Sequence, residues 1–473
     1  MKANLRKTKI VSTIGPASES EERLIELANA GFSVARINFS HGGYEENAIK
    51  IDTIKKVRKE LQKPIALLLD TKGPEIRTGK LESGDEKVLI KEGQKFTFVH
   101  DDIIGNETKT TLTYKDLYKD VVPGAKILVD DGSIEFKVIE IKEQDIICEA
   151  LNQGKLGSRK TVNVPGLKLN LPALAPKDIA DITNGVKANF DFIAASFVRR
   201  ADDVQQIRKL LDDNGGQDIK IISKIESEEG VRNFEEILEI SDGIMVARGD
   251  LGVEIPAEQV PIVQKRFIKR CNEVGKPVIT ATQMLESMIQ SPKPTRAEVS
   301  DVANAVYDRT SAIMLSGECA VGKYPVLCVE TMDKIAKTTE NDINYWKRFN
   351  EKSLVDITDD VERNIATSTC ITAENVKAEA IVVYAEKPEI VYEIASKGPK
   401  CPIFAITNNE KTFHLLGIAW GVTPILVNNT ENAIEEGINV LKEKELIDVN
   451  DIIVVAGKEE ENETIISTVR KIK

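Results

Sequence analysis

Residues 219–250 read IKIISKIESEEGVRNFEEILEISDGIMVARGD and contain two apolar segments on either side of an amphipathic one. The first eight and the last eight residues of this stretch have the length and apolar content of buried β-strands. Two buried strands joined by a helix form a parallel pair with a crossover connection. The stretch therefore predicts a strand–helix–strand unit of a parallel sheet.

Charged side chains stand where each of these two predicted strands ends. Lys224 and Glu226 are two residues apart, which places them on one face of a strand, and Asp250 ends the next strand. Three charges at one edge of a sheet are costly to desolvate unless something binds among them. A structural ion pair between Lys224 and Glu226 is the alternative, and Asp250 at the same level makes it less favoured. Carboxylates suit a hard divalent cation such as Mg²⁺, so we expect a metal site beside a lysine.

The chain of 473 residues, with 41% hydrophobic and 30% charged residues, has the composition of a globular protein of about two to four domains. Its net charge of −12 argues against non-specific binding to nucleic acid or to an anionic membrane. No apolar run has the length of a membrane span, and we expect no signal peptide. Six cysteines without a CxxC pair indicate free thiols in a reducing compartment, so we expect a cytoplasmic protein.

Strand-like apolar runs alternate with helical segments over most of the chain. The runs expected to belong to one sheet lie at residues 8–15, 32–39, 64–70, 191–197, 219–226, 243–250, 277–284 and 312–318. Eight parallel strands with intervening helices predict an α/β fold of the (β/α)8 TIM-barrel type.

Residues 74–170 lack the hydrophobic periodicity of long helices and contain short strands of alternating polarity, separated by glycine and proline turns. This segment predicts an all-β domain, expected as a β-barrel, inserted in the third βα loop of the large barrel. The large barrel then comprises residues 1–73 and 171–340. Strands and helices alternate again in residues 341–473, which predict a separate open α/β domain at the C-terminus.

Nearly every predicted barrel strand ends in a polar or charged residue, and in such barrels the chemistry takes place at the carboxyl ends of the strands. In chain order these residues are Arg36, Asn38, Ser40, Asp70, Thr71, Ser196, Lys224, Glu226, Gly249, Asp250, Thr282 and Ser316. Taken singly, each has an ordinary alternative, such as an ion pair of Arg36 with Asp70. Together they predict a functional site at this face of the barrel.

Hard oxygen ligands gather at the ends of the second and third strands. Asn38 and Ser40 lie on one face of the second strand, and Asp70 and Thr71 end the third. An amide oxygen, a hydroxyl, one carboxylate and a backbone carbonyl suit K⁺ better than a divalent cation. Capping and hydrogen bonding at two strand ends is the alternative.

Seven segments carry a resemblance to a known family: ARINFSHG, DTKGPEIRTG, SKIESEEG, MVARGDLGVE, TATQMLESM, PTRAEVSDVANAV and IMLSGE. They resemble the pyruvate kinases, in the family's order and along almost the whole chain. The resemblance implies transfer of the phosphoryl group of phosphoenolpyruvate to ADP, which gives pyruvate and ATP as the final step of glycolysis. It also implies Mg²⁺ (or Mn²⁺) and K⁺ as cofactors, a β-domain that acts as a lid, and a homotetramer.

Carried over by motif position, the resemblance assigns roles to individual residues. Arg36 would hold the transferred phosphoryl group with Lys224 beside it, and Glu226 with Asp250 would bind the divalent cation. Relatives that do not need K⁺ carry a lysine in place of Glu75. This chain has a glutamate at that position and no replacement cation, so Asp70 and Glu75 lack a counter-charge. The resemblance therefore implies that this chain requires K⁺.

The remaining roles concern the substrate carboxylate and the nucleotide. The backbone amides of Gly249 and Asp250 and the hydroxyl of Thr282 would hold the carboxylate, as helix N-termini hold anions. Thr282 is also the choice for protonating the enolate, through a water. The residues implied to contact the nucleotide phosphates are Arg77, Lys160 and His41.

The chain departs from the family's pattern in three places. Arg309 stands where relatives have glycine, so it is expected to hold a backbone conformation that glycine adopts more easily, and Ser311 replaces an acidic residue. Residues 384–389 read YAEKPE where sugar-phosphate-activated relatives have a Ser/Thr/Gly-rich loop, so we expect no activation through this loop. The additional C-terminal domain of some bacterial relatives is expected to be absent.

Two other functions are compatible with parts of the pattern. A Mg²⁺-dependent lyase or aldolase acting on a pyruvate-like acid would use Glu226 and Asp250 but would not need Arg77, Lys160 or the inserted domain. A non-catalytic paralogue is the second alternative, and it is disfavoured because every assigned charged position holds the expected type of residue.

Overall fold

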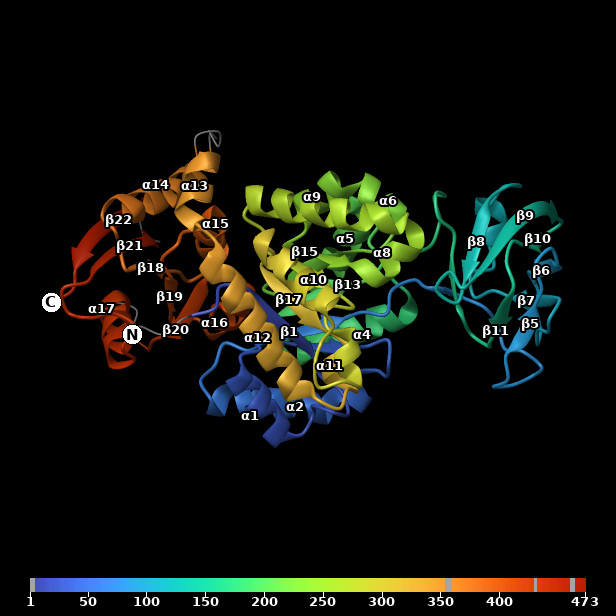
Figure 1. Cartoon of the computed structure of the whole chain (residues 1–473), viewed down its shortest axis with the longest axis horizontal. Coiled ribbons are helices and arrows are strands. Elements are labelled where there is room, and N and C mark those ends of the chain that lie inside the picture. The colour runs from blue at the N-terminus through green and yellow to red at the C-terminus, as the bar shows by residue number, and fades with distance from the viewer. Residues whose placement is uncertain (1–4, 354–359, 429–431, 460–463) are drawn as a thin grey trace.

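The computed structural model describes residues 5–353, 360–428, 432–459 and 464–473. Three bodies lie in a row, with the C-terminal domain at one end, the large barrel in the middle and the inserted β-domain at the other end (Figure 1). None of the helices in the described part of the chain combines the length and the apolar character needed to cross a membrane.

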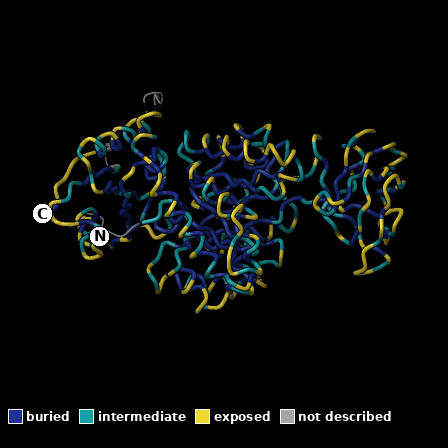
Figure 2. Tube along the Cα trace, in the orientation of Figure 1, coloured by how far each residue is buried: buried dark blue, intermediate teal, exposed yellow. Residues whose placement is uncertain are grey.

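The central body is a closed barrel of eight parallel strands, as predicted from the sequence. Its strands are β1 (Lys9–Thr13), β2 (Val34–Asn38), β3 (Ala66–Asp70), β13 (Phe192–Ala195), β14 (Lys220–Ile225), β15 (Gly243–Ala247), β16 (Val278–Ala281) and β17 (Ala312–Leu315). Three strands precede the insert and five follow it, and β1 pairs with β17 to close the ring. The buried segments are concentrated in this body (Figure 2), because strands that face the barrel interior on one side and helices on the other are apolar on both faces.

The helices between these strands pack around the barrel. They are α1 (Glu21–Ala30), α2 (Tyr44–Glu60), α4 (Pro176–Lys187), α5 (Ala201–Asp213), α6 (Glu228–Arg232), α7 (Phe234–Ile240), α8 (Arg248–Glu254), η1 (Ala257–Gln259), α9 (Val260–Glu273), η2 (Glu286–Ile289), α10 (Arg296–Tyr307), α11 (Gly317–Ala320) and α12 (Pro325–Asp342). The strand predicted at 243–250 is shorter than expected, because the chain turns into α8 at Arg248. Gly249 and Asp250 therefore lie in the first turn of a helix.

The insert is an all-β domain with its own core, in which Phe96, Phe98 and Phe136 pack together. Its elements are β4 (Ile76–Arg77), β5 (Val88–Ile90), β6 (Lys95–Val99), β7 (Lys109–Thr111), a short α3 (Leu117–Asp120), β8 (Lys126–Val129), β9 (Ile134–Lys142), β10 (Asp145–Ala150), β11 (Gly154–Leu156) and β12 (Thr161–Asn163). The strands form a seven-stranded sheet, β4-β12-β8-β9-β10-β6-β7, and a two-stranded sheet, β11-β5. Backbone hydrogen bonds from the N–H of Gly79 to Thr111 and from the N–H of Thr113 to Arg77, with a bridge between Thr78 and Leu112, join the two ends of the seven-stranded sheet, so it closes on itself as the expected β-barrel.

The C-terminal domain is an open sheet in the order β20-β19-β18-β21-β22, parallel except for the last strand. Its elements are α13 (Tyr345–Ser353), α14 (Val361–Asn375), β18 (Ala380–Tyr384), α15 (Glu389–Lys397), β19 (Ile403–Thr407), α16 (Glu410–Leu415), η3 (Leu416–Ile418), β20 (Val422–Leu426), α17 (Ala433–Glu443), β21 (Ile452–Glu459) and β22 (Thr464–Lys471). This is the architecture that the sequence predicts for the last part of the chain.

The C-terminal domain closes the end of the barrel where the strands begin. Leu415 and Ile418 share one hydrophobic cluster with side chains of the barrel strands. A Cβ atom at Gly417 would lie 2.4 Å from the carbonyl oxygen of Pro64 and 2.9 Å from that of Ser33, so only glycine fits this contact. The opposite end, where the strands finish, remains for the site.

Arg309 contributes to the contact between the barrel and the C-terminal domain, and Ser311 is bonded within the barrel. Arg309 has a φ of +68°, the left-handed conformation expected at this position. Its buried guanidinium donates through NH2 to the carbonyl oxygens of Ala395 and Ser396, at 3.2 and 2.7 Å, near the end of α15. Ser311 accepts a hydrogen bond from the backbone N–H of Val278. Both departures from the family's pattern are thus accommodated by defined contacts.

Candidate active site

A buried cluster of two cations and two carboxylates lies at the carboxyl ends of the barrel strands. Nζ of Lys224 is 2.9 Å from Oδ1 of Asp70 and 3.0 Å from Oε1 of Glu226. Nε of Arg36 is 2.7 Å from the other oxygen of Asp70. Ser196 joins the cluster, because its hydroxyl oxygen accepts from Lys224 Nζ at 2.7 Å. Side chains of four strand ends, separated by up to about 190 residues of sequence, meet here because parallel strands of a barrel finish at one face.

The cluster is built so that its charges stabilise one another. Burial raises the pKa of Asp70, but Arg36 and Lys224 lower it by more, so that the pKa lies below the ordinary value. Burial lowers the pKa of Lys224, and the carboxylates of Asp70 and Glu226 more than reverse this effect. Burial raises the pKa of Glu226 to about 7 against the opposing effect of Lys224. Glu226 is therefore a carboxylate that a further cation would stabilise in its charged form.

The donor set at Glu226 and Asp250 fits a divalent cation that keeps several positions for other ligands. Among the described residues, no group of three or more His, Cys, Asp or Glu side chains is arranged to hold a metal ion. Two carboxylates with open positions are what Mg²⁺ commonly uses when a substrate supplies the remaining oxygens.

The four residues expected to bind K⁺ are already engaged in hydrogen bonds. Oδ1 of Asn38 accepts from the backbone N–H of Ser40 at 3.0 Å, and the carbonyl oxygen of Thr71 accepts from the hydroxyl of Ser196 at 2.6 Å. Both oxygens of Asp70 contact cations. The expectation that Asp70 and Glu75 lack a counter-charge is wrong, because Nε of Arg77 lies 2.7 Å from Glu75.

The loop after β16 brings Thr282 to the start of α8. The hydroxyl oxygen of Thr282 accepts from the backbone N–H of Gly249 at 2.8 Å and donates to the carbonyl oxygen of Ala281 at 2.7 Å. Thr282 and Gln283 have φ values of +68° and +55°. The amide and the hydroxyl expected to hold the substrate carboxylate are thus neighbours, bonded to each other.

The residues expected to contact the nucleotide are spread over the insert and one barrel loop. Arg77 lies in β4, where its NH1 donates to the carbonyl oxygen of Arg159 at 3.0 Å. Lys160 immediately precedes β12, and its Nζ lies 2.8 Å from Oδ1 of Asp130. His41 is exposed in the segment between β2 and α2. The two basic side chains of the insert are held by acidic or carbonyl oxygens of the insert itself.

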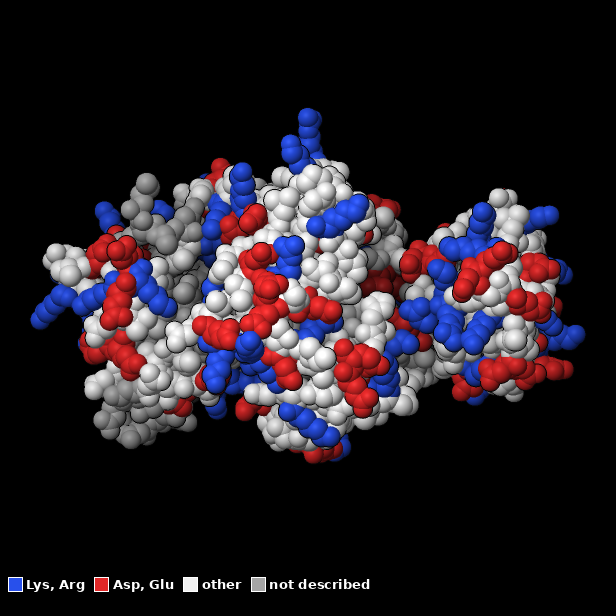
Figure 3. Space-filling model, turned by 90° about the horizontal axis from the view of Figure 1, so that it is seen from below, with Lys and Arg blue, Asp and Glu red and all other residues white. Residues whose placement is uncertain are grey.

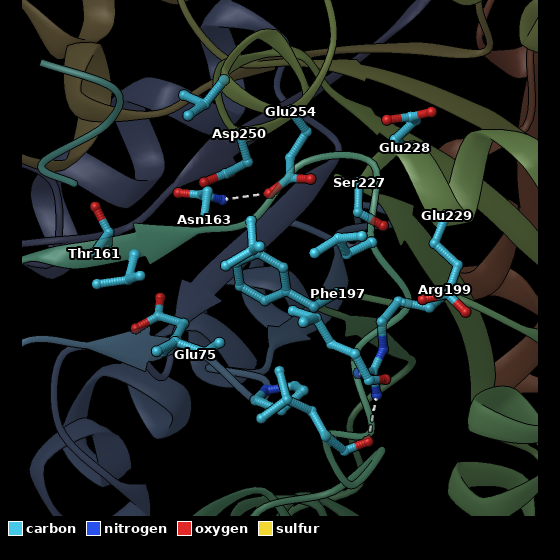
Figure 4. A pocket seen from close by; sticks show the side chains of 18 of the residues that line it. Glu75, Thr161, Asn163, Phe197, Arg199, Ser227, Glu228, Glu229, Asp250 and Glu254 are labelled. Carbon is cyan, nitrogen blue, oxygen red and sulfur yellow. Dashed lines mark hydrogen bonds between the residues drawn. The ribbon is translucent and has the colours of Figure 1, made fainter. Parts of the chain in front are cut away.

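A pocket separates the insert from the barrel (Figure 4), and both domains contribute to its lining. A hydrogen bond of 2.8 Å from Nδ2 of Asn163, in the insert, to Oε1 of Glu254, in α8, crosses between the two domains. Acidic side chains gather in the hollow between barrel and insert (Figure 3). The lining residues that carry carboxylates are Glu75, Asp131, Glu228, Glu229, Asp250 and Glu254. Such a pocket favours cations, including metal-bound forms of anionic ligands.

Sequence reasoning placed Ser196 at a strand end but gave it no role, and it did not single out Asn163 or Glu254. Ser196 could have been found, because its strand lies between those of Asp70 and Lys224 in the barrel order. Asn163 lies in a strand of the insert with no charge pattern that points across to α8.

The fold and the strand-end cluster define a (β/α)8-barrel enzyme with a β-insert and a C-terminal α/β domain. The family model described as the pyruvate kinase barrel domain matches residues 5–329, and the one described as the pyruvate kinase alpha/beta domain matches residues 363–470. The chain therefore belongs to the pyruvate kinase family. It is a transferase that moves the phosphoryl group of phosphoenolpyruvate to ADP and gives pyruvate and ATP.

Individual relatives agree with this assignment over nearly the whole chain. A pyruvate kinase of Clostridium acetobutylicum is 47% identical over 462 residues, which are 96% of this chain and 96% of the relative. One of Geobacillus stearothermophilus is 48% identical over 96% of this chain and 77% of its own length. The crystal structure of a pyruvate kinase from Cryptosporidium parvum superposes with a TM-score of 0.94 at 40% identity and covers 99% of this chain and 96% of that one.

Proposed function

We propose that the strand-end cluster is the place of phosphoryl transfer and that Arg36 and Lys224 are its catalytic cations. The observation that supports this most is the contact chain from Arg36 through Asp70 to Lys224 and Glu226. Phosphoryl transfer requires positioning and neutralisation of charge more than covalent chemistry. Arg36 would hold the transferred group, and Lys224 would stabilise the enolate oxygen that carries negative charge when the group leaves.

Glu226 and Asp250 would hold a divalent cation, Mg²⁺ or Mn²⁺, and the members of this family are generally metal-dependent. When bound there, the cation supplies positive charge beside the substrate oxygens. Asn38, Ser40, Asp70 and Thr71 would hold K⁺, with the Asn38 and Thr71 oxygens as neutral donors. Ligand binding at this second site would have to compete with the hydrogen bonds that these oxygens accept.

Gly249, Asp250 and Thr282 would hold the substrate carboxylate. Gly249 and Asp250 lie in the first turn of α8, where backbone N–H groups and the helix dipole favour an anion. Binding would replace the bond between Gly249 and Thr282 with bonds to the substrate. Thr282 would then remain near the enolate and could pass a proton to it through a water.

Arg77 and Lys160 of the insert, together with His41 of the barrel, would contact the nucleotide phosphates. The insert would act as a lid, and the bond between Asn163 and Glu254 is one contact that such a lid makes with the barrel. Closing it would exclude water, which otherwise hydrolyses the phosphoryl group. We further propose a homotetramer in the cytoplasm.

The experiment that tests this function is ATP formation from phosphoenolpyruvate and ADP with Mg²⁺ and K⁺ present. The same reaction without ADP is the matched control. We expect pyruvate to appear only with ADP and in equal amount to ATP. Pyruvate release without ADP would favour the lyase alternative, and no turnover under either condition would favour a non-catalytic paralogue.

A further inference from the structure

The loop that follows β16 holds two residues in a conformation that they rarely adopt. Thr282 has a φ of +68° and Gln283 one of +55°. For a β-branched residue such as threonine this conformation is a genuine outlier, because its Cβ substituents crowd the backbone. Conformations of this kind persist only where the surroundings enforce them, and they cluster at functional sites.

The side chain of Arg248 holds this loop through hydrogen bonds to its backbone. Its Nε donates to the carbonyl oxygen of Ala281 at 3.1 Å, and its NH2 donates to that of Thr282 at 2.7 Å. Its NH1 lies 2.6 Å from Oδ1 of Asp301 in α10, and the side chain is only 13% exposed. One guanidinium thus fixes the two carbonyl groups on either side of the φ angle of Thr282 and is itself anchored to another helix.

The backbone that carries Arg248 holds the same threonine from the opposite direction. Arg248 begins α8, and the N–H of the next residue, Gly249, donates to the hydroxyl oxygen of Thr282. Thr282 is therefore fixed at its carbonyl by the side chain of Arg248 and at its hydroxyl by the amide that follows Arg248.

We propose that Arg248 is a positioning residue, which holds Thr282 in its left-handed conformation so that the hydroxyl and the Gly249 amide face one substrate carboxylate. This inference rests on the proposed role of Thr282 in binding that carboxylate. Arg248 does not need to touch the substrate itself.

The geometry requires arginine at this position. The planar guanidinium serves two carbonyl oxygens and a carboxylate at the same time, and its donors have a fixed fork. A lysine at the same place keeps the charge opposite Asp301 but offers one ammonium group to all three acceptors. Arg248→Lys should therefore preserve the ion pair with Asp301 and weaken the hydrogen bonds that hold the loop after β16.

The primary test compares Arg248→Lys with Arg208→Lys. Arg208 is a matched control, because its NH2 also donates to a backbone carbonyl, that of Ile219 at 3.0 Å, and to a carboxylate, that of Asp242 at 2.9 Å, at the opposite end of the barrel. We expect Arg248→Lys to lower kcat/KM for phosphoenolpyruvate by roughly 10–100-fold, in the range that a misplaced binding group costs. KM for ADP should stay unchanged, and Arg208→Lys should behave as wild type. An equal rise in KM for ADP and for phosphoenolpyruvate would mean that Arg248 supports the site as a whole, and it would overturn the proposal.

A double-mutant cycle separates this inference from the proposed function. Thr282→Ala should lower kcat/KM for phosphoenolpyruvate, and adding Arg248→Lys to it should have little further effect, because Arg248 acts only through Thr282. Additive losses would overturn the role of Arg248 and leave that of Thr282 standing. Wild-type kinetics of Thr282→Ala would overturn both. If Arg248→Lys does not fold, Asp301→Ala takes its place in the same cycle, because it removes the carboxylate that anchors the guanidinium. Additive losses and wild-type kinetics of Thr282→Ala then carry the same meaning as before.

Discussion

Nζ of Lys224 lies 2.9 Å from Oδ1 of Asp70, although the two residues belong to strands that are not neighbours in the barrel. Asp70 therefore holds the ammonium group in place before any ligand binds. Because Arg36 contacts the other oxygen of the same carboxylate, the two cations share one counter-charge. Such an arrangement keeps both cations fixed and directed at the place where negative charge develops during the reaction.

Replacing Lys224 by methionine tests its role in the transition state. Because the lysine stabilises charge that develops during transfer, we expect kcat to fall by about 10²–10³, or about 2.7–4 kcal/mol. KM for phosphoenolpyruvate should change much less, since Arg36 and the metal ligands remain. Lys220→Met is the matched control, because Lys220 lies at the other end of the same strand and pairs with Glu389. Equal losses in affinity and turnover would assign Lys224 to uniform binding instead.

A requirement for K⁺ is the second prediction. We expect low turnover in tetramethylammonium buffer with Mg²⁺ and recovery when KCl is added. Glu75→Lys should relieve the requirement by supplying a cation, and Glu75→Gln, which also removes the partner of Arg77, should not. Full wild-type activity without KCl would mean that the oxygens of Asn38 and Thr71 serve only the hydrogen bonds seen here.

Fructose 1,6-bisphosphate is expected to have no effect through the loop before α15. The pocket at this loop is lined by three glutamates and one lysine, and Pro388, which precedes α15, has no N–H to offer a phosphate. Glu389 is further held by its ion pair with Lys220. Saturation curves for phosphoenolpyruvate with and without the sugar phosphate test this. A shift to lower concentration that disappears when residues 384–389 are exchanged would contradict it.

The left-handed backbone at Arg309 predicts an unusual order of stability for two variants. Arg309→Ala and Arg309→Gly both lose the hydrogen bonds to the carbonyl groups of Ala395 and Ser396, so both should be less stable than wild type by roughly 1–3 kcal/mol. Glycine adopts a φ of +68° without strain, so Arg309→Gly should be the more stable of the two by about 1 kcal/mol. Denaturant unfolding measures the difference. An alanine variant as stable as the glycine variant would mean that the backbone relaxes once the guanidinium is gone.

A half-buried lysine makes the stability of the contact between barrel and C-terminal domain depend on pH. Burial, with Arg6 and Lys7 nearby and only Glu340 opposing them, lowers the pKa of Lys9 to about 7. Its Nζ donates to the carbonyl oxygen of Val422 in the C-terminal domain. Above pH 7 the folded protein has released this proton while the unfolded chain keeps it up to about pH 10.4, so the unfolded state binds more protons and stability rises with pH.

The comparison of wild type with Lys9→Met between pH 7.0 and about 8.5 isolates this effect, because the thiols titrate alike in both proteins and their contribution cancels. We expect the melting temperature of wild type to rise relative to that of the variant as the pH increases. Lys269→Met, at an exposed lysine of α9, is the control and should show no such trend. A difference in melting temperature between wild type and Lys9→Met that stays constant or decreases with pH would contradict the prediction.

The eight barrel strands and the residues at their ends could be predicted from local pattern alone. Apolar runs of strand length, each followed by a helical segment, fix the order of the elements, and parallel strands place their carboxyl ends on one face. Lys224, Glu226 and Asp250 follow from this reasoning because each ends a strand or begins the helix after it. The short strands of the insert are harder to predict, because a strand of two or three residues is too short to show a periodic alternation of apolar and polar residues.

The pairing within the cluster depends on contacts between residues far apart in the sequence, and no local pattern contains it. The sequence allowed an ion pair of Arg36 with Asp70, but the second cation on the same carboxylate comes from a strand 154 residues later. The left-handed backbone of Thr282 likewise depends on Arg248 from the preceding strand end. Threonine has no intrinsic preference for that conformation, and the free energy that stabilises it comes from hydrogen bonds that exist only once the barrel has closed.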